Sequence, residues 1–208
     1  MAAETRATLP PEGRPGSMFW QQKLDGNRVI VYIRAGSLYL QSRSGADLTP
    51  HFHELQAAAA DIGEDLVLDS ELVVLHEGRL DFAALQQRAR LGGFRARSVA
   101  RVRPAHVVTF DLLEADGEEL LARPYRERWA RLETLFTGRK LAGRWALVGS
   151  THHRQEALAW MDPAWGCVGI EGVVAKPAAD RYRPGKGGWW KVRSRQRPKP
   201  SSAPPPGR

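Results

Sequence analysis

The order of strands and helices predicted from the sequence indicates an α+β fold of antiparallel sheets flanked by helices. Short alternating runs predict strands at 28–33 and 37–41, and Arg34-Ala35-Gly36 between them predicts a hairpin. Strands and helices do not alternate strictly along the chain. We therefore do not expect a doubly wound parallel sheet.

The remaining elements follow from hydrophobic periodicity. Further strands are predicted at 66–75, 105–113, 168–176 and 189–193, with a turn at Glu77-Gly78. Helices are predicted at 49–60, 81–90 and 123–137. Thr49-Pro50 supplies the start of the first helix, and Phe82 and Leu85 are expected to be buried by the second.

Composition divides the chain into three parts. Residues 1–17 are rich in Pro, Gly and Ala and predict a flexible extension, and residues 195–208 predict a disordered basic, Pro-rich tail. Residues 18–194 are expected to form one domain. The absence of a signal pattern, of a long apolar run and of any cysteine besides Cys167 predicts a cytoplasmic protein without a membrane segment or disulfide.

The net charge of the chain is +8, from 31 Lys and Arg against 23 Asp and Glu. Such a balance favours polyanionic partners, whose phosphates attract basic side chains. A GC-rich coding sequence would also raise the arginine content. Charge alone therefore does not identify a partner.

The most informative stretch is Lys23-Leu24-Asp25-Gly26-Asn27-Arg28. A lysine acts as a nucleophile only after losing its proton, which neighbouring cations, a metal or burial can promote. Asp25 and Gly26 would form a tight turn that presents the amine. The motif by itself is equally compatible with an ordinary surface turn.

Acidic residues inside predicted strands point to the same chemistry. Asp69 and Glu71 lie on one face of a strand, where they could hold a ribose hydroxyl or a divalent metal, or simply face solvent. Glu171 interrupts an apolar strand, which is costly unless the carboxylate is paired or bound to metal.

The last predicted strand and the strand at 105–113 add two further features. Lys191 and Arg193 share one strand face and could clamp a phosphate, although a basic edge strand would look the same. Phe110 could stack on a nucleotide base, and the alternative is an ordinary core phenylalanine.

Taken in chain order, these motifs resemble the adenylation domain of bacterial ATP-dependent DNA ligases, which are covalent nucleotidyltransferases. The matching segments are 23–28, Ser42-Arg43-Ser44-Gly45, Leu68-Asp69-Ser70-Glu71-Leu72, Phe110-Asp111-Leu112-Leu113, 171–176 and Trp190-Lys191-Val192-Arg193. Segments 78–88, 123–128 and 182–185 add secondary matches. The resemblance covers about residues 18–194 and implies the nucleotidyltransferase fold.

The resemblance also implies a role for each matched residue. It implies that Lys23 attacks the α-phosphate of ATP and carries AMP, which then passes to a DNA 5′-phosphate at a nick or break. The implied nucleotide-binding residues are Gln21, Arg28, Arg43, Glu71, Phe110, Lys176, Lys191 and Arg193. Glu71 and Glu171 are the implied ligands of Mg²⁺ or Mn²⁺. Roles in DNA repair, recombination and replication, and a nucleoid-associated location, follow from the same resemblance.

The sequence departs from the ligase pattern at several positions. Gln21 replaces a usual glutamate that helps to read adenine, which leaves the base selectivity open. Ser70 replaces a glycine, Arg193 replaces a lysine, and 186–188 lacks a usual arginine.

The tail after the last motif is too short for an OB-fold domain, so we expect that domain, a polymerase or an end-binding protein to act as a separate partner. Nick sealing by the chain alone is then expected to be weak. Two other functions remain open: an RNA ligase or capping-type transferase, and a non-catalytic DNA-binding module derived from a ligase.

Overall fold

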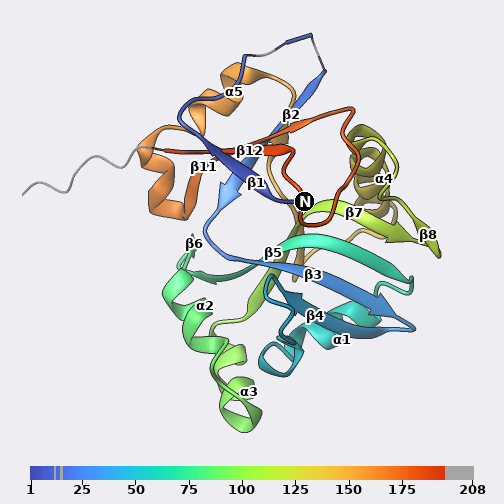
Figure 1. The fold of residues 1–208 in the computed structure, drawn as a ribbon. Helices are drawn as coiled ribbons and strands as arrows, with labels where there is room; N and C mark the ends of the chain where they lie inside the picture. Colours follow the sequence, from blue (N-terminus) through green and yellow to red (C-terminus); the bar gives the residue numbers. More distant parts are fainter. Residues whose placement is uncertain (12, 15, 195–208) are drawn as a thin grey trace, which may run out of the picture.

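The computed structural model of the chain describes residues 1–11, 13–14 and 16–194 (Figure 1). Two β-sheets, called here the large and the small sheet, form the centre of the molecule, and helices pack around them. Nearly all strand pairs are antiparallel; the parallel pairs are β1 with β12 and β7 with β9. The predicted α+β fold with antiparallel sheets is confirmed. The predicted tail at 195–208 lies outside the described residues.

The large sheet has the strand order β4-β3-β5-β7-β8. Its strands are β3 (Asn27–Arg34), β4 (Ser37–Ser42), β5 (Leu66–His76), β7 (Ala105–Ala115) and β8 (Glu118–Glu119). Two short strands join it at the side: β6 (Arg79–Leu80) pairs with β5, and β9 (Trp145–Leu147) pairs with β7. The strands predicted at 28–33, 37–41, 66–75 and 105–113 are confirmed.

Three hairpins of the large sheet close through the same kind of turn. Ala35-Gly36, Glu77-Gly78 and Asp116-Gly117 each connect two neighbouring strands, and both residues of every pair have positive φ. Two consecutive positive φ angles define the type I′ turn, whose twist matches that of the flanking strands. The small residue Gly at the second position explains why the turns at Gly36 and Gly78 could be predicted.

The small sheet has the order β1-β12-β11-β2-β10. Its strands are β1 (Ala3–Arg6), β2 (Met18–Leu24), β10 (Ser150–Thr151), β11 (Ile170–Pro177) and β12 (Trp189–Arg193). The prediction of a flexible segment at 1–17 is wrong for β1, which pairs with the outer edge of β12. Composition could not reveal this, because the pairing partner lies almost 190 residues away in the sequence.

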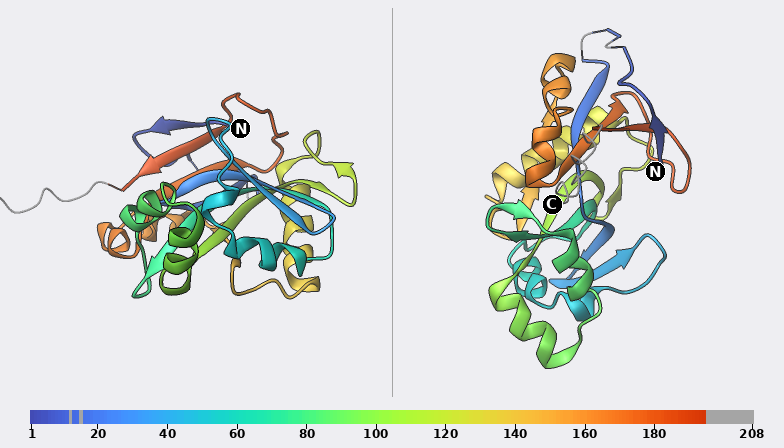
Figure 2. Two further views of the ribbon diagram at one scale, coloured as in Figure 1. Left: turned by 90° about the horizontal axis from the view of Figure 1, so that it is seen from below. Right: turned by 90° about the vertical axis from the view of Figure 1, so that its left-hand side faces the viewer.

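The helical segments are η1 (Thr49–His51), α1 (Glu54–Ala60), α2 (Phe82–Arg88), α3 (Gly93–Val102), α4 (Tyr125–Gly138), α5 (Arg154–Ala159) and η2 (Pro163–Val168). Among the described residues, no helix is both long enough and apolar enough to cross a membrane. Figure 2 shows that α3 lies at the edge of the molecule, away from both sheets.

Two helix predictions need correction. The single helix predicted at 49–60 is interrupted at Phe52, whose backbone leaves the helical region, so α1 begins only at Glu54. The Thr49 hydroxyl accepts a hydrogen bond from the Leu40 amide instead of capping a helix. Phe82 was expected in the core but is 37% exposed, whereas Leu85 is fully buried as predicted.

The two faces of the large sheet have different partners because side chains alternate along a strand. On one face, Val31 of β3 and Leu68 of β5 pack against Leu55 of α1 and Trp129 of α4 in the main hydrophobic core. On the other face, Tyr32 packs in a smaller cluster that includes residues of the small sheet. The second face therefore borders the space between the two sheets.

A buried ion pair fastens α4 to the large sheet. The Arg128 Nε and Nη2 atoms each donate to a carboxylate oxygen of Asp111 at 2.8 Å, and both side chains are 0% exposed. Arg128 also donates to the backbone carbonyls of Arg123 and Asp180. The guanidinium thus ties together β7, α4 and the segment that leads to β12.

We predict that Arg128→Met lowers the free energy of unfolding by about 3–5 kcal/mol, because it leaves the Asp111 carboxylate buried without its partner. Arg131→Met on the same helix is the matched control. Arg131 pairs with the exposed Glu118 and should contribute at most about 1 kcal/mol. Urea unfolding of the two variants and the parent measures both values, and equal losses would contradict the assignment.

Candidate active site

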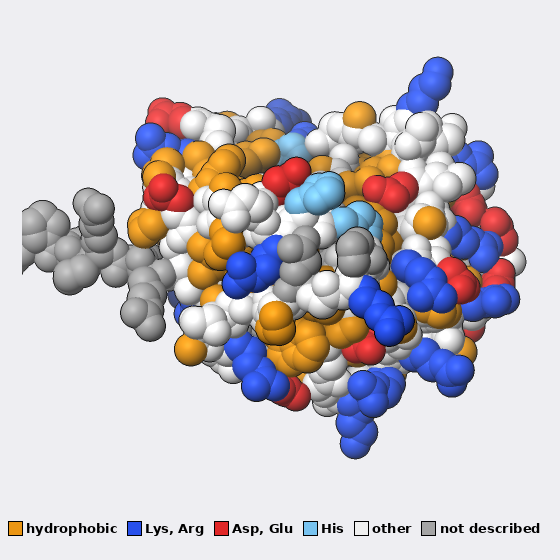
Figure 3. Space-filling model, turned by 90° about the horizontal axis from the view of Figure 1, so that it is seen from above, with side chains coloured by type: hydrophobic (Ala, Val, Ile, Leu, Met, Phe, Trp, Pro, Cys, Tyr) orange, Lys and Arg blue, Asp and Glu red, His pale blue; other side chains and the backbone are white. Residues whose placement is uncertain are grey.

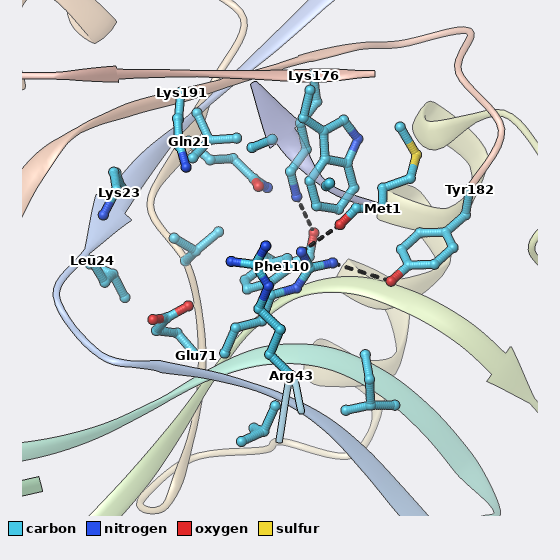
Figure 4. A pocket seen from close by; sticks show the side chains of 18 of the residues that line it. Met1, Gln21, Lys23, Leu24, Arg43, Glu71, Phe110, Lys176, Tyr182 and Lys191 are labelled. Carbon is cyan, nitrogen blue, oxygen red and sulfur yellow. Dashed lines mark hydrogen bonds between the residues drawn. The ribbon is translucent and has the colours of Figure 1, made fainter. Parts of the chain in front are cut away.

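A cavity of about 560 Å³ lies between the two sheets (Figure 4). It is lined by the predicted catalytic residue, Lys23, and by seven of the residues predicted to bind nucleotide: Gln21, Arg28, Arg43, Glu71, Phe110, Lys176 and Lys191. They come from both sheets: β2, β11 and β12 of the small sheet, and β3, β5, β7 and the end of β4 from the large sheet. Of the predicted site residues, Arg193 and Glu171 lie outside this lining.

Lys23 lies near the end of β2, and its ammonium forms a hydrogen-bonded ion pair with Glu171 of β11. The two side chains remain 18% and 30% exposed, so the amine is accessible from the cavity side. Glu171 is thus paired with a cation, as its position in an apolar strand required. Arg193 lies near the same carboxylate, with its Nη2 atom 3.9 Å from Glu171 Oε2.

Two glycines permit this close arrangement. A Cβ atom on Gly26 would lie 2.6 Å from the Leu72 carbonyl oxygen and 2.7 Å from Glu71 Cγ. A Cβ on Gly172, which pairs opposite Lys23 and has a φ of 143°, would lie 2.1 Å from the Val192 carbonyl oxygen. Only glycine therefore allows the strands around Lys23 to approach one another this closely.

The two acids of β5 have separate environments. Asp69 is fully buried and accepts hydrogen bonds from Arg28 Nε at 2.8 Å and from the Tyr182 hydroxyl at 2.8 Å. Asp69 therefore holds Arg28 in place, and the carboxylate that faces the cavity is that of Glu71. Figure 4 shows Glu71 and Lys23 on the same side of the pocket.

Burial raises the pKa of Glu71 from its ordinary 4.5 to about 8. The Lys23 and Arg28 cations oppose this shift, while the Asp69 and Asp25 carboxylates add to it. Burial and the neighbouring Glu171 carboxylate also raise the pKa of Asp25. Acidic groups thus crowd around Lys23, and a bound cation would relieve their repulsion.

Phe110 and Lys176 form the inner wall of the cavity. Lys176 is 1% exposed, its Nζ donates to the Phe110 carbonyl oxygen at 2.9 Å, and it lies 4.5 Å from the Phe110 ring centroid. Burial lowers the pKa of Lys176 to about 7. The Arg28 guanidinium lies 5.7 Å from the centroid of the same ring. Because the Phe110 ring borders the cavity, it is more than a core residue.

Sequence reasoning missed some residues of this region. Met1 and Ala3 line the cavity, and the Met1 carbonyl accepts a hydrogen bond from Arg28. Tyr125, just outside the lining, hydrogen-bonds to Gln21 across 104 residues of sequence. Neither contact leaves a local signal, since both depend on how the two sheets face each other.

Two facing sheets around a pocket that carries a lysine, buried acids and an aromatic ring define an adenylation-type nucleotidyltransferase domain. A family model described as "ATP dependent DNA ligase domain" matches residues 8–193. The chain belongs to the ATP-dependent DNA ligase family. This confirms the resemblance seen in the sequence.

Relatives and solved structures agree with this assignment. DNA ligase C2 of Mycolicibacterium smegmatis is 34% identical over 181 residues, 86% of this chain and 50% of the relative. DNA ligase C of Mycobacterium tuberculosis is 31% identical over 196 residues, 93% of this chain and 53% of the relative. The chain thus spans about half the length of these curated relatives.

A similar solved structure is that of mycobacterial DNA ligase D complexed with ATP and MES. It has a TM-score of 0.70 and 30% identity, and the match covers 92% of this chain and 60% of the other. The multifunctional non-homologous end joining DNA repair protein LigD of M. tuberculosis is 35% identical over 172 residues, 80% of this chain and 20% of the relative.

We predict that the stability advantage of Glu71→Gln over the parent grows as the pH rises from about 5 to about 8. A buried acid with a raised pKa holds its proton in the folded state and loses it in the unfolded state across this range, so folding weakens with rising pH. Each unit of pKa shift corresponds to about 1.4 kcal/mol, so the change should reach a few kcal/mol.

Urea unfolding at pH 5, 6.5 and 8 measures this difference in the ligand-free protein. Glu119→Gln on the exposed strand β8 controls for the loss of one carboxylate. A Glu71→Gln advantage that is constant over this pH range would show that the Glu71 carboxylate is not held neutral by burial.

Proposed function

We propose that this domain forms a covalent lysyl-AMP intermediate on Lys23 and transfers the AMP to the 5′-phosphate of nicked or broken DNA. In the first step the Lys23 amine attacks the α-phosphorus of ATP. A nitrogen–phosphorus bond forms, the bond to pyrophosphate breaks, and the ammonium proton is released. In the second step an oxygen of the DNA phosphate attacks the same phosphorus, and the lysine leaves and regains a proton.

The observation that carries this proposal is the meeting of Lys23, Glu71 and Lys191 in one cavity with an aromatic wall at Phe110. Phosphoryl transfer depends mostly on positioning and on neutralising charge, and this pocket has groups for both. The paired Glu171 carboxylate orients the Lys23 ammonium and is the nearest acceptor for its proton. Lys191 lies on β12 and lines the cavity, where its ammonium can neutralise charge on the α-phosphate.

The ring of Phe110 borders the same cavity, which supports its stacking on the base. Glu71 lines the cavity on the Lys23 side, which supports a role as acceptor for a ribose hydroxyl. Arg43 extends from the end of β4 at the exposed rim, where a phosphate of the nucleotide or of DNA can reach it. The solved relative that contains ATP supports this use of the pocket.

A magnesium or manganese ion fits the acidic groups near Lys23. Magnesium is usually held by one or two carboxylates together with substrate phosphates. Glu171 and Glu71 can provide these carboxylates, and no group of three or more metal-ligating side chains occurs among the described residues. When bound, the ion would neutralise charge on the phosphates that reach Lys23.

We predict that the protein, incubated with α-labelled ATP and a divalent ion, acquires label that survives denaturation and is released by acid. Lys23→Arg keeps the positive charge beside Glu171 but removes the nucleophile, and it should acquire at least about 1,000-fold less label. Lys140→Ala, which changes an exposed lysine beyond α4, is the matched control and should be labelled like the parent.

Three outcomes bear on the functions that remained open after the sequence analysis. Label from ATP that depends on Lys23 supports a ligase of DNA or RNA, and label from GTP supports a capping-type transferase. No label under any condition overturns the proposed chemistry and favours a non-catalytic module.

For the DNA substrate, a second surface supports the proposal. From Phe82 to Phe110 the sequence contains six arginines and no acidic residue. Four of these arginines, at positions 90, 95, 97 and 101, are exposed and form no ion pair with any described residue. They lie on or just before α3, which packs on the body through Ala96 and Ala100. The face seen in Figure 3, by contrast, mixes basic with acidic side chains.

The helix before this arginine surface contacts the strand that follows the reactive lysine. Gln86 of α2 donates to Asn27 at 3.1 Å, and Asn27 is the first residue of β3, four positions after Lys23. We propose that a duplex held by α3 through its phosphates extends from there toward the pocket. The relative that acts in non-homologous end joining supports a role in DNA repair.

We predict that replacing Arg95, Arg97 and Arg101 together by glutamine weakens binding to nicked duplex DNA. The slope of log affinity against log salt should fall by about 2–3, because each lost phosphate contact releases about one counterion fewer. The control replaces Arg126, Arg131 and Arg139, on or next to α4, and removes the same charge. If both triple variants lose the same slope, α3 does not contact DNA.

A further inference from the structure

Two residues that line the cavity, Gln21 and Trp189, carry a buried polar atom without a partner among the described residues. Gln21 is 1% exposed and lines the cavity, yet its side-chain oxygen Oε1 accepts no hydrogen bond. A buried acceptor of this kind costs free energy unless something donates to it. Figure 4 shows the amide end of Gln21 pointing into the pocket near Phe110. A molecule in the cavity that presents a hydrogen-bond donor to this oxygen would satisfy it.

The orientation of the Gln21 amide is set by Tyr125. The Tyr125 hydroxyl donates its only proton to the Phe110 carbonyl oxygen at 2.9 Å. Toward Gln21 the same oxygen can therefore only accept, and Gln21 Nε2 donates to it at 2.7 Å. Turning the amide over would require the hydroxyl proton to leave Phe110. The hydrogen-bond network thus assigns the amino end of Gln21 to Tyr125 and the oxygen to the cavity.

Surrounding groups keep Tyr125 itself in place. The residue is fully buried and packs edge-on against Phe19, with a ring-centroid distance of 5.0 Å. Lys176 Nζ lies 3.5 Å from the Tyr125 hydroxyl and donates to the same Phe110 carbonyl at 2.9 Å. The lysine thus contacts both the donor and the acceptor of the Tyr125–Phe110 hydrogen bond and helps to hold them together.

We propose that Tyr125 is a positioning residue that fixes Gln21 as a hydrogen-bond acceptor and thereby selects a 6-aminopurine over a 6-oxopurine nucleotide. This inference rests on the proposed function of the pocket. The amino group of a 6-aminopurine donates to Gln21 Oε1. A 6-oxopurine presents a carbonyl instead and brings two acceptors together, and a site built around one hydrogen bond rejects such a ligand.

A glutamine differs from a carboxylate at this position in one respect. A carboxylate accepts in either orientation, whereas a glutamine accepts only while its amide is prevented from turning. The selectivity of this chain therefore depends on Tyr125, a residue outside the cavity lining.

The test compares labelling of the protein by ATP and by inosine triphosphate, which has a 6-oxo group and no 2-amino group. The parent should prefer ATP by about 100-fold in kcat/KM. Tyr125→Phe should reduce this preference about tenfold, mainly through KM, because the amide can then turn. Gln21→Glu in the Tyr125→Phe background should restore the preference, since a carboxylate needs no orientation.

A purely structural role of Tyr125 would change labelling by both nucleotides equally and leave their ratio intact, which overturns the inference. A parent that is labelled by neither nucleotide overturns the proposed function instead. If Tyr125→Phe does not fold, the test uses the parent protein alone and adds a third nucleotide, the triphosphate of purine riboside, which lacks the 6-substituent. Its kcat/KM should lie between those of ATP and inosine triphosphate, and equal values for all three would refute the inference.

Discussion

The site depends on a short crossing of the chain from one sheet to the other. β2 ends at Leu24 in the small sheet and β3 begins at Asn27 in the large sheet, so only Asp25 and Gly26 connect them. The missing side chain of Gly26 allows this crossing to lie directly on β5, next to Glu71. Lys23 therefore lies at the end of one sheet, and Arg28 lies near the start of the next. As a consequence, both Lys23 and Arg28 border the cavity between the sheets.

Buried polar groups hold the two sheets at this separation. Arg28 and Asp69 of the large sheet are linked to Tyr182 in the segment that leads to β12, and Lys176 of β11 donates to the carbonyl of Phe110 on β7. Such contacts are specific in direction, unlike apolar packing, and leaving one unmade is costly. They fix the walls of the pocket before any ligand binds, which is what a reaction that relies on positioning requires.

Much of the fold could be predicted because its information is local. The hairpins of the large sheet follow from alternating residues and from glycine in their turns, and the strand at 189–193 was predicted with its observed bounds. β1, β2 and α3 were missed: β1 and β2 are set by pairing with distant strands, and Gly92-Gly93 gave no helix signal for α3. Phe82 shows the converse, since an apolar side chain in a helical pattern proved to be exposed.

The candidate site, too, could be predicted from the sequence only in part. The ordered motifs predicted which residues would meet. Lys23 and seven of the eight predicted nucleotide-binding residues line the cavity. The sequence could not predict the environment of each of these residues. Spacing could not show that Asp69 binds Arg28 while Glu71 faces the cavity, nor that Tyr125 orients Gln21. These distinctions arise from contacts between residues that are 41 and 104 positions apart in the sequence.

The central claim is that Lys23 carries the nucleotide. Mass spectrometry of the intact protein after incubation with ATP and magnesium, followed by fragmentation of its peptides, tests this claim most directly. The account predicts the mass of one added AMP per chain, located on the Lys23 side chain and removed by excess pyrophosphate. Stable AMP on any other residue, or an unmodified chain in the presence of ATP and metal, would contradict it.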